Sequence, residues 1–349
     1  MADFARSIRY PFETPPPEGE MTEVAEGILW ARLPLPMALD HVNVYALEGD
    51  DGWTVVDTGF DSRRTRAIWR KLLARPLAGK PVARVLITHH HPDHMGLAGW
   101  FQSEHGAELL TSRTAWLTAR MLILDEQSRP APETVAFWRS AGMPGDMLAR
   151  RAEERPFNFA DTVAPLPLGY TRVQGDERLE LGGRGWLVLT GHGHAPEHLT
   201  LWSEDSSVVL AGDQIIASIS PNIGVYATEP EADPVAEWLE SCERFQIYAD
   251  PRQLVLPGHK LPFVGTQTRL DQLIQNHHGA LARLEAFLGE PHTAVECFRT
   301  LFKRDIGSAE FGLALVEAMA HCIHLWHAGR VTRVMRDDGA WLWAARGDV

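Results

Sequence analysis

Short apolar segments separated by turn residues dominate the first quarter of the chain. Residues 41–47 alternate apolar and polar positions, as a half-buried strand does. Residues 48–52 are rich in Gly and Asp and predict the turn of a hairpin. The predicted elements are strands at 27–35, 41–47, 53–56 and 84–87 and a helix at 61–75. The chain therefore opens as a strand-rich segment with one helix.

A helical pattern follows from about residue 95 to 158, with Pro and Gly breaks near residues 130 and 142–145. This segment is long for a simple connection, so we expect a helical insertion that covers a site. The elements predicted after it are strands at 186–189, 199–202, 208–210 and 254–256 and a helix at about 267–288. Strands mixed with helices in this way favour a layered α/β domain.

The tail, residues 292–349, has a different pattern of apolar and polar positions. The pattern predicts two helices, at about 293–303 and 308–328, followed by a β-hairpin. The turn of that hairpin, Asp337-Asp-Gly339, has residues typical of a type I′-like turn. Helices followed by a β-hairpin suggest a small winged-helix-like domain. The expected parts of the chain are a Pro- and Glu-rich extended arm at 1–20, a large domain at 21–288 and the winged-helix-like domain at 292–349.

Composition narrows the class of protein. The 349 residues are 45% hydrophobic and 23% charged, an ordinary globular balance, and the formal net charge is −13. Because phosphate contacts supply most of the affinity of nucleic-acid binders, this acidic total argues against a nucleic-acid partner. The three cysteines show no CxxC spacing, the N-terminus lacks a signal-peptide pattern, and no run of about 18 apolar residues occurs. We therefore expect a cytoplasmic protein without a membrane span.

A histidine-rich cluster stands at Ile87-Thr-His-His-His-Pro-Asp-His-Met-Gly96. It follows an apolar strand and precedes a helix, so four ligand-capable side chains share one strand-end turn. Imidazole and carboxylate groups together suit zinc, iron or manganese. His89 and His91 can hold one ion, and Asp93 and His94, which point the other way along the turn, can hold a second.

Two ions need more ligands than this cluster supplies, and later strand ends offer three. They are His194, Asp213 and His259, and each stands beside a glycine that lets backbone approach closely. Strand ends that converge on one edge are the expected layout of a site in a layered α/β protein. Asp213 is the natural bridge, because a carboxylate can give one oxygen to each ion.

The spacing H-x-H-x-D-H, followed by G-H, G-D and G-H, resembles the metallo-β-lactamase superfamily over about residues 20–265. Asp57-Thr-Gly59 matches that family as well. The resemblance implies an αββα sandwich as the catalytic domain, with the metals at one edge. It also implies one ion on His89, His91 and His194, a second on Asp93, His94 and His259, and Asp213 between them.

Departures from the family pattern bear on the reaction. The usual G-H-T-P-G-H is here Gly193-His-Ala-Pro-Glu-His198, so Ala195 and Glu197 replace Thr and Gly. Zinc β-lactamases commonly have Cys where this chain has Asp213, which argues against a penicillin substrate. The redox, diiron branch commonly has Glu where this chain has His91, so His91 favours hydrolysis over electron transfer.

Weaker candidates surround the predicted ligands. We expect Asp57 to orient ligands through hydrogen bonds, and His198 to do the same unless it only packs. Lys260 directly follows a ligand and is a candidate for binding a substrate carboxylate or phosphate, with an ordinary surface lysine as the alternative. Tyr226 is a candidate donor to a developing oxyanion, with ordinary packing as the alternative.

Together these residues predict a metal-dependent hydrolase with two divalent ions, zinc first and iron or manganese as alternatives. Ions about 3.5–4 Å apart would supply a bridging hydroxide near neutral pH, and Asp93 or Asp213 would pass a proton to the leaving group. The core resembles the glyoxalase II and thioesterase branch, so we expect a small acyl substrate, a thioester or lactone. The tail resembles that of lactamase-like endoribonucleases, which makes a phosphodiesterase or endoribonuclease the alternative. Residues 293–349 hold seven basic and seven acidic residues, which favours packing or a homodimer contact over nucleic-acid binding.

Overall fold

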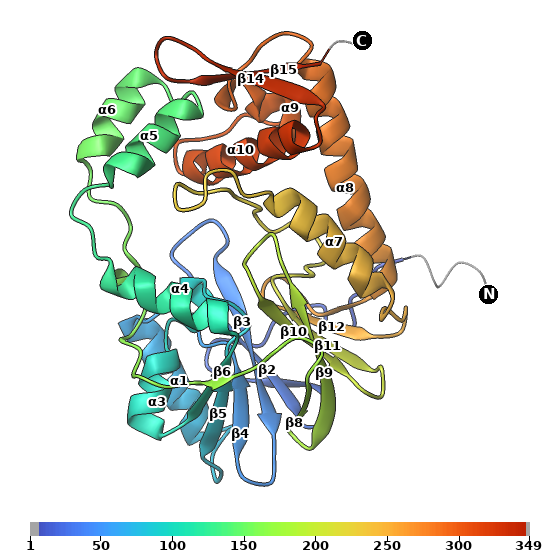
Figure 1. Cartoon of the computed structure of the whole chain (residues 1–349). Coiled ribbons are helices and arrows are strands. Elements are labelled where there is room, and N and C mark those ends of the chain that lie inside the picture. The colour runs from blue at the N-terminus through green and yellow to red at the C-terminus, as the bar shows by residue number, and fades with distance from the viewer. Residues whose placement is uncertain (1–6, 347–349) are drawn as a thin grey trace. The chain divides into compact units, whose positions relative to one another are not determined.

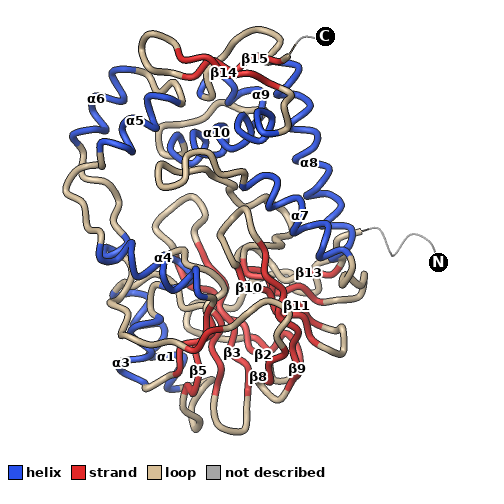
Figure 2. The backbone as a smooth tube through the Cα atoms, in the orientation of Figure 1, coloured by secondary structure: helices blue, strands red, loops and turns tan. Residues whose placement is uncertain are grey.

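The computed structural model describes residues 7–346 and divides into two compact units (Figures 1 and 2). The first unit takes in the described residues up to Glu126, then Asn158–Pro221 and Arg244–Leu270. The second takes in Gln127–Phe157, Asn222–Glu243 and the described residues from Asp271 on. The division falls inside two helices, α7 (Pro234–Gln246) and α8 (Thr266–Phe287).

A seven-stranded sheet in the order β1-β2-β3-β4-β5-β6-β7 forms one layer of the first unit. Strands β1 to β4 pair antiparallel, whereas β4 to β7 pair parallel. The strands are β1 (Thr22–Ala25), β2 (Ile28–Pro34), β3 (His41–Glu48), β4 (Trp53–Val56), β5 (Val82–Leu86), β6 (Glu108–Thr111) and β7 (Thr171–Arg172). The four strands predicted in this part of the chain are confirmed, with small shifts at their ends, but residues 41–47 are buried on both faces rather than half-buried.

A six-stranded sheet in the order β13-β12-β11-β10-β9-β8 forms the second layer. Its neighbours pair antiparallel except β11 and β12, which are parallel. The strands are β8 (Arg178–Leu181), β9 (Arg184–Gly191), β10 (His198–Ser203), β11 (Val208–Gly212), β12 (Leu254–Pro257) and β13 (Phe263–Val264). Of the predicted N-terminal arm, residues 1–6 lie outside the described residues, and Arg9 forms a β-bridge with Val264.

Apolar side chains pack between the two sheets. Trp30 and Leu86 of the first sheet share a buried cluster with Trp186 and Leu201 of the second. A separate cluster joins the other face of the first sheet to α1 (Arg63–Ala74) and α3 (Ala98–His105). On the second sheet, Phe245 in the last turn of α7 packs against Trp202, with ring centroids 5.7 Å apart. The predicted α/β sandwich of two sheets flanked by helices is confirmed (Figure 1).

The segment expected to be helical from about 95 to 158 contains a strand, so that expectation is wrong at Glu108–Thr111. This strand is β6, and its two leucines face opposite ways, Leu109 into the cluster under the helices and Leu110 into the cluster between the sheets. Burial on both faces removes the alternation that marks a half-buried strand. The helices of the segment are α2 (Pro92–Met95), α3, α4 (Arg113–Leu124), α5 (Pro132–Ser140) and α6 (Gly145–Glu153), and the short η2 (Phe159–Asp161) follows it. Helices α5 and α6 belong to the second unit, whereas α3 and α4 belong to the first.

The C-terminal part of the second unit holds two helical segments and a hairpin. Its elements are η3 (Val295–Cys297), α9 (Phe298–Phe302), α10 (Phe311–His327), β14 (Val331–Met335) and β15 (Trp341–Ala345). The predicted hairpin is confirmed, and Gly339 in its turn has a φ of 87°. Arg333 lies over the ring of Trp326 at 3.8 Å and that of Trp341 at 4.6 Å, which ties the hairpin to α10. The winged-helix assignment stays a prediction.

Membrane insertion was not expected from the sequence. Among residues 7–346, none of the helices combines the length and the apolar character that crossing a bilayer requires.

Candidate metal centre

The ends of parallel strands place six of the seven candidate ligands, and His194 follows the antiparallel strand β9. Because β4 and β5 run parallel, Asp57 after β4 and the histidine-rich turn after β5 emerge at one edge of the first sheet. Because β11 and β12 run parallel, Asp213 and His259 emerge together in the second sheet. Pro92 begins the one-turn helix α2, and its fixed φ suits a first helical position. This local sequence therefore turns Asp93 and His94 away from the strand.

One group of possible ligands consists of His89, His91 and His194, whose ligand atoms lie within 4.8 Å of one another. His89 Nε2 and His91 Nδ1 are 3.0 Å apart. Two nitrogens bound to one tetrahedral zinc ion stand about 3.3 Å apart, given bonds of about 2.0–2.1 Å. The spacing of this pair is thus close to that of two ligands on one ion.

A second group consists of Asp93, His94 and His259. Asp93 Oδ2 lies 3.5 Å from His94 Nε2 and 3.4 Å from His259 Nε2. Asp213 lies between the groups: its Oδ1 is 3.5 Å from His94 Nε2, and its Oδ2 is 3.6 Å from His194 Nε2 and 3.2 Å from His259 Nε2. The structure therefore brings all seven predicted ligands together, with Asp213 in the position that a bridging carboxylate would occupy.

Hydrogen bonds hold the outward nitrogens of the ligand histidines. His94 Nδ1 donates to Asp57 Oδ2 at 2.7 Å, and Asp57 also accepts from the backbone N–H and hydroxyl of Thr88. His259 Nδ1 donates to the carbonyl oxygen of His41 at 2.6 Å. A histidine whose Nδ1 is the donor presents an unprotonated Nε2, which is the form that binds metals. Asp57 thus has the contacts expected of a residue that orients a ligand.

His198 supports Asp213 rather than joining a ligand group. Its Nε2 accepts the backbone N–H of Asp213 at 3.1 Å, and its ring stacks on His89 with centroids 4.5 Å apart. Burial, aided by the nearby His194, lowers the pKa of His198 to about 3. The ring is therefore neutral and can act as an acceptor at ordinary pH.

The charges of the cluster suit cations. Burial acts to lower the pKa of His259, but Asp213 and Asp93 outweigh it and raise that pKa to about 9. His94 Nε2 and Asp213 Oδ1 are both buried and have no hydrogen-bond partner among residues 7–346. Buried polar atoms are normally partnered, so these two point to a group that binds them. Imidazole and carboxylate donors together fit divalent zinc, iron or manganese.

The weaker substrate-binding candidates lie in different units. Lys260 directly follows the ligand His259 in the first unit, with a left-handed backbone φ of 68°. Tyr226 belongs to the second unit and is 49% exposed. The structure therefore brings Lys260, and not Tyr226, into the same turn as a candidate ligand.

Several supporting residues were not predicted from the sequence. Thr88 holds Asp57, and His41 and Asn43 on β3 contact the turn that carries His259. The carboxylate of Glu197, in the loop of His194, accepts the backbone N–H of Thr114 near the start of α4 at 2.8 Å. The only signal in the sequence for His41 and Asn43 is polarity within an apolar strand, which does not identify a partner.

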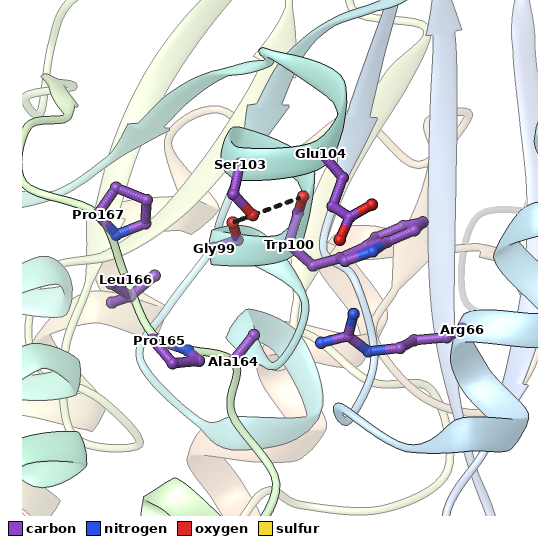
Figure 3. Close-up of a pocket in the computed structure, with 9 residues that line it drawn as sticks. All are labelled: Arg66, Gly99, Trp100, Ser103, Glu104, Ala164, Pro165, Leu166 and Pro167. Atoms are coloured by element: carbon purple, nitrogen blue, oxygen red, sulfur yellow. Dashed lines mark hydrogen bonds between the residues drawn. The ribbon is translucent and has the colours of Figure 1, made fainter.

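A surface pocket of about 360 Å³ lies elsewhere in the first unit, beside α1 and α3 (Figure 3). Arg66 approaches the ring of Trp100 there, at 5.7 Å, but its guanidinium is already bound by both oxygens of Asp61. The Ser103 hydroxyl donates to the carbonyl oxygen of Gly99 at 2.8 Å. None of the candidate ligands lines this pocket, so it is not part of the metal centre.

Two facing sheets carry a His- and Asp-rich centre at their strand ends, an arrangement typical of a metal-dependent hydrolase. Comparison with known proteins agrees. The chain belongs to the metallo-β-lactamase superfamily, whose sequence profile matches residues 37–259. A profile described as the metallo-beta-lactamase-like C-terminal domain matches residues 281–346.

Two solved structures are similar to nearly the whole chain, and two curated relatives to a smaller part of it. The structure of a beta-lactamase domain protein from Burkholderia ambifaria is 34% identical, with a TM-score of 0.89 over 98% of this chain and 99% of that one. A metallo-beta-lactamase family protein from Thermus thermophilus is 27% identical, with a TM-score of 0.77 over 93% and 100%. "Probable metallo-hydrolase YqjP" of Bacillus subtilis (strain 168) is 27% identical over 85% of this chain and 91% of its own. A "Linear primary-alkylsulfatase" of a Pseudomonas strain is 24% identical over 68% of this chain and 44% of its own length.

Proposed function

We propose that this hydrolase uses two divalent ions to cleave a small acyl compound, a thioester or a lactone. The observation that carries the proposal is the convergence of seven His and Asp side chains around Asp213. His89, His91 and His194 would hold one ion, Asp93, His94 and His259 the other, and Asp213 both. When bound, such a pair of ions supplies a water of near-neutral pKa and polarises the oxygen of the scissile group.

The protein's own contribution is to orient the ligands and to move a proton. Asp57 and the His41 carbonyl fix two ligand rings, as described above. Asp93 is the more exposed of the two central carboxylates, with 16% of its side chain accessible against 8% for Asp213. We assign to Asp93 the transfer of a proton to the leaving group, because a partly exposed carboxylate can exchange that proton with solvent.

An apolar helix face supports an acyl substrate. Helix α4 begins just after β6, whose carboxyl end shares an edge with β5 and the histidine-rich turn, because the two strands are parallel. Leu117, Met121 and Leu124 on α4 are 54%, 50% and 72% exposed, and their spacing puts them on one side of the helix. Such a surface suits the hydrocarbon part of a small ester better than a polyanion. The net charge of −13 and Asp213 in place of Cys favour the same substrate class.

Lys260 would bind a carboxylate or phosphate of the substrate. Its backbone is held in the left-handed region, which costs a non-glycine residue of order 1 kcal/mol or more. Such strain is concentrated at functional sites, and here it falls on the residue next to a candidate ligand. Lys260→Gly keeps this backbone and removes the charge, so we expect a raised KM for anionic substrates without loss of stability. Lys260→Ala, which the backbone disfavours, is the matched control for strain.

A panel of substrates tests the proposed function. The metal-loaded enzyme is assayed on glutathione and coenzyme A thioesters, acyl lactones of increasing chain length, a cephalosporin reporter, an alkyl sulfate, a phosphodiester and single-stranded RNA. The alkyl sulfate is included because one relative is named for that activity. We expect cleavage of thioesters or lactones, and a loss of roughly 10³-fold or more in Asp213→Ala.

Other outcomes would redirect the assignment. Metal-dependent cleavage of RNA or the phosphodiester, with every acyl substrate inert, would favour the phosphodiesterase alternative. Near-normal turnover in Asp213→Ala would contradict the proposed centre itself. Fewer than two ions per chain after purification without chelator would contradict its dinuclear form.

A further inference from the structure

An asparagine amide lies buried between the two sheets. Asn43 on β3 is 1% exposed. Its Oδ1 accepts hydrogen bonds from Trp30 Nε1 at 3.0 Å and Arg32 Nε at 3.3 Å, both on the neighbouring strand β2. Its Nδ2 donates to the carbonyl oxygens of Pro257 at 2.9 Å and Lys260 at 2.8 Å. All four hydrogen-bonding positions of the amide are thus used, two within its own sheet and two on the facing one.

The turn that Asn43 holds, residues 257–260, carries the candidate ligand His259. The backbone N–H of Asn43 also donates to this turn, to the Gly258 carbonyl at 2.7 Å. His41, two residues earlier on β3, accepts from His259 Nδ1 with its carbonyl oxygen and from the Lys260 N–H with its ring Nε2, at 2.6 and 2.9 Å. One strand of the first sheet therefore fixes the ligand-bearing turn of the second.

The turn needs this support because its own backbone is strained. Lys260 has a φ of 68°, and its carbonyl oxygen is held by Arg32 Nη2 at 2.6 Å in addition to Asn43. With the turn in place, His259 Nε2 lies 3.4 Å from Asp93 Oδ2 and 3.2 Å from Asp213 Oδ2. A shift of the turn by even half an ångström would change both separations, and metal ligands tolerate only small deviations.

We propose that Asn43 is a positioning residue of the metal centre: by fixing the 257–260 turn, it sets the affinity for the ion held by Asp93, His94 and His259. The proposal rests on the two-ion centre of the proposed function and is independent of the substrate. Residues that orient a ligand typically contribute ten- to hundredfold to metal affinity. The ion on the first group of ligands depends less on Asn43, because the amide's hydrogen bonds to the second sheet run to the 257–260 turn.

Asn43→Asp is the sharpest test, because it replaces the donating NH₂ by an acceptor of the same size. The variant keeps the acceptor for Trp30 and Arg32 and loses both side-chain donors to the turn. Metal-free full-length protein is titrated with zinc in competition with a chelator, and both dissociation constants are measured. We expect one ion to bind ten- to hundredfold more weakly and the other to bind as in wild type. Trp30→Phe, which removes a donor to the same amide within its own sheet, should lower stability and leave both affinities unchanged.

A second variant covers a failure of Asn43→Asp to fold. Arg32→Met removes the separate hydrogen bond to the Lys260 carbonyl and should weaken the same ion by a smaller factor. The proposal would be overturned if both ions still bound these variants as tightly as wild type, or if the affinity for both ions fell equally. A wild-type protein that binds fewer than two ions would overturn both this proposal and the proposed centre. A wild-type protein that binds two ions but cleaves no acyl substrate would contradict only the substrate.

Discussion

At the scale of single residues, the packing of the candidate metal centre requires glycine at two positions beside its ligands. A Cβ atom at Gly258 would lie 2.2 Å from Asp213 Oδ1 and 2.7 Å from His94 Cε1. A Cβ atom at Gly212 would lie 2.6 Å from His198 Cε1. These distances are far shorter than a Cβ atom can tolerate. Both positions therefore require glycine, because imidazole and carboxylate groups pack directly against the backbone there.

Gly258→Ala tests this dependence. The added methyl group must displace Asp213 or His94, and because each belongs to a ligand group, we expect weaker metal binding by tenfold or more and a corresponding loss of hydrolysis. The measurement is metal content after dialysis against a weak chelator. Gly145→Ala, where a Cβ atom meets nothing within 4 Å, is the control and should retain its metal. Retention of two tightly bound ions in Gly258→Ala would show that the ligands are not held where we place them.

The sequence identifies the candidate ligands that the structure brings together, but it does not identify their supporting residues. Each ligand follows an apolar strand and stands in a chemically distinctive motif, so type and position together identify it. Asn43 is a single polar residue in an apolar strand, and its partner Pro257 is 214 positions away. No local pattern connects the two, because the contact exists only once the sheets face each other.

At the scale of elements, the residues that flank a short buried strand decide whether the sequence pattern identifies it. The sequence of β3 alternates apolar and polar residues, and clear turn residues separate it from β4. The pattern therefore predicts both strands nearly to the residue. β4 and β6 are each four residues long and buried on both faces, but β4 follows the turn residues 48–52. β6 lies between helices α3 and α4, so its leucines resemble part of a helical stretch. The assignment of α5 and α6 to the second unit depends on packing with distant segments and has no counterpart in their own sequence.

Helix α10 carries a buried acid that makes stability depend on pH. Burial raises the pKa of Glu317 to about 7 from its ordinary 4.5, although Asn222 Nδ2 donates to its Oε2 at 2.7 Å. Between these pH values the folded chain holds a proton that the unfolded chain has lost. The stability that this group contributes is therefore complete below about pH 4.5 and is lost as the pH rises through 7.

Glu317→Gln should remove this dependence, because the amide stays neutral at every pH. We expect the free energy of unfolding of wild type to fall relative to the variant by roughly 2–3 kcal/mol between pH 5 and pH 8, at most about 1.4 kcal/mol per pH unit. Urea denaturation of both proteins at several pH values measures the difference directly, and other titrating groups cancel in it. Parallel stability curves would mean that Glu317 titrates normally in the folded chain.

At the scale of the whole molecule, the candidate metal centre belongs to one of the two units. All seven candidate ligands lie in the first unit. Within residues 7–346, no group of three possible ligands was found in the second unit. The two family profiles, which match residues 37–259 and 281–346, differ from this division, because the first also takes in Gln127–Phe157 and Asn222–Glu243 of the second unit. The second unit has instead its own aromatic packing, where Arg333 lies among Trp326, Trp341 and Trp343.

The location of the candidate ligands predicts which parts of the chain lose stability when metal is removed. An ion that binds only the folded state stabilises it by RT ln(1 + [L]/Kd), about 4 kcal/mol at a thousandfold excess over Kd. Chelation should therefore speed amide hydrogen exchange in the turns after β5, β11 and β12, while exchange in α10 and the β14–β15 hairpin stays the same. Re-addition of zinc should restore protection, and Asp213→Ala, which lacks the carboxylate proposed to bridge the ions, should respond less to both treatments. If α10 lost protection as strongly as the ligand turns, the ions would stabilise the molecule as one cooperative body, and the confinement of their effect to the first unit would be wrong.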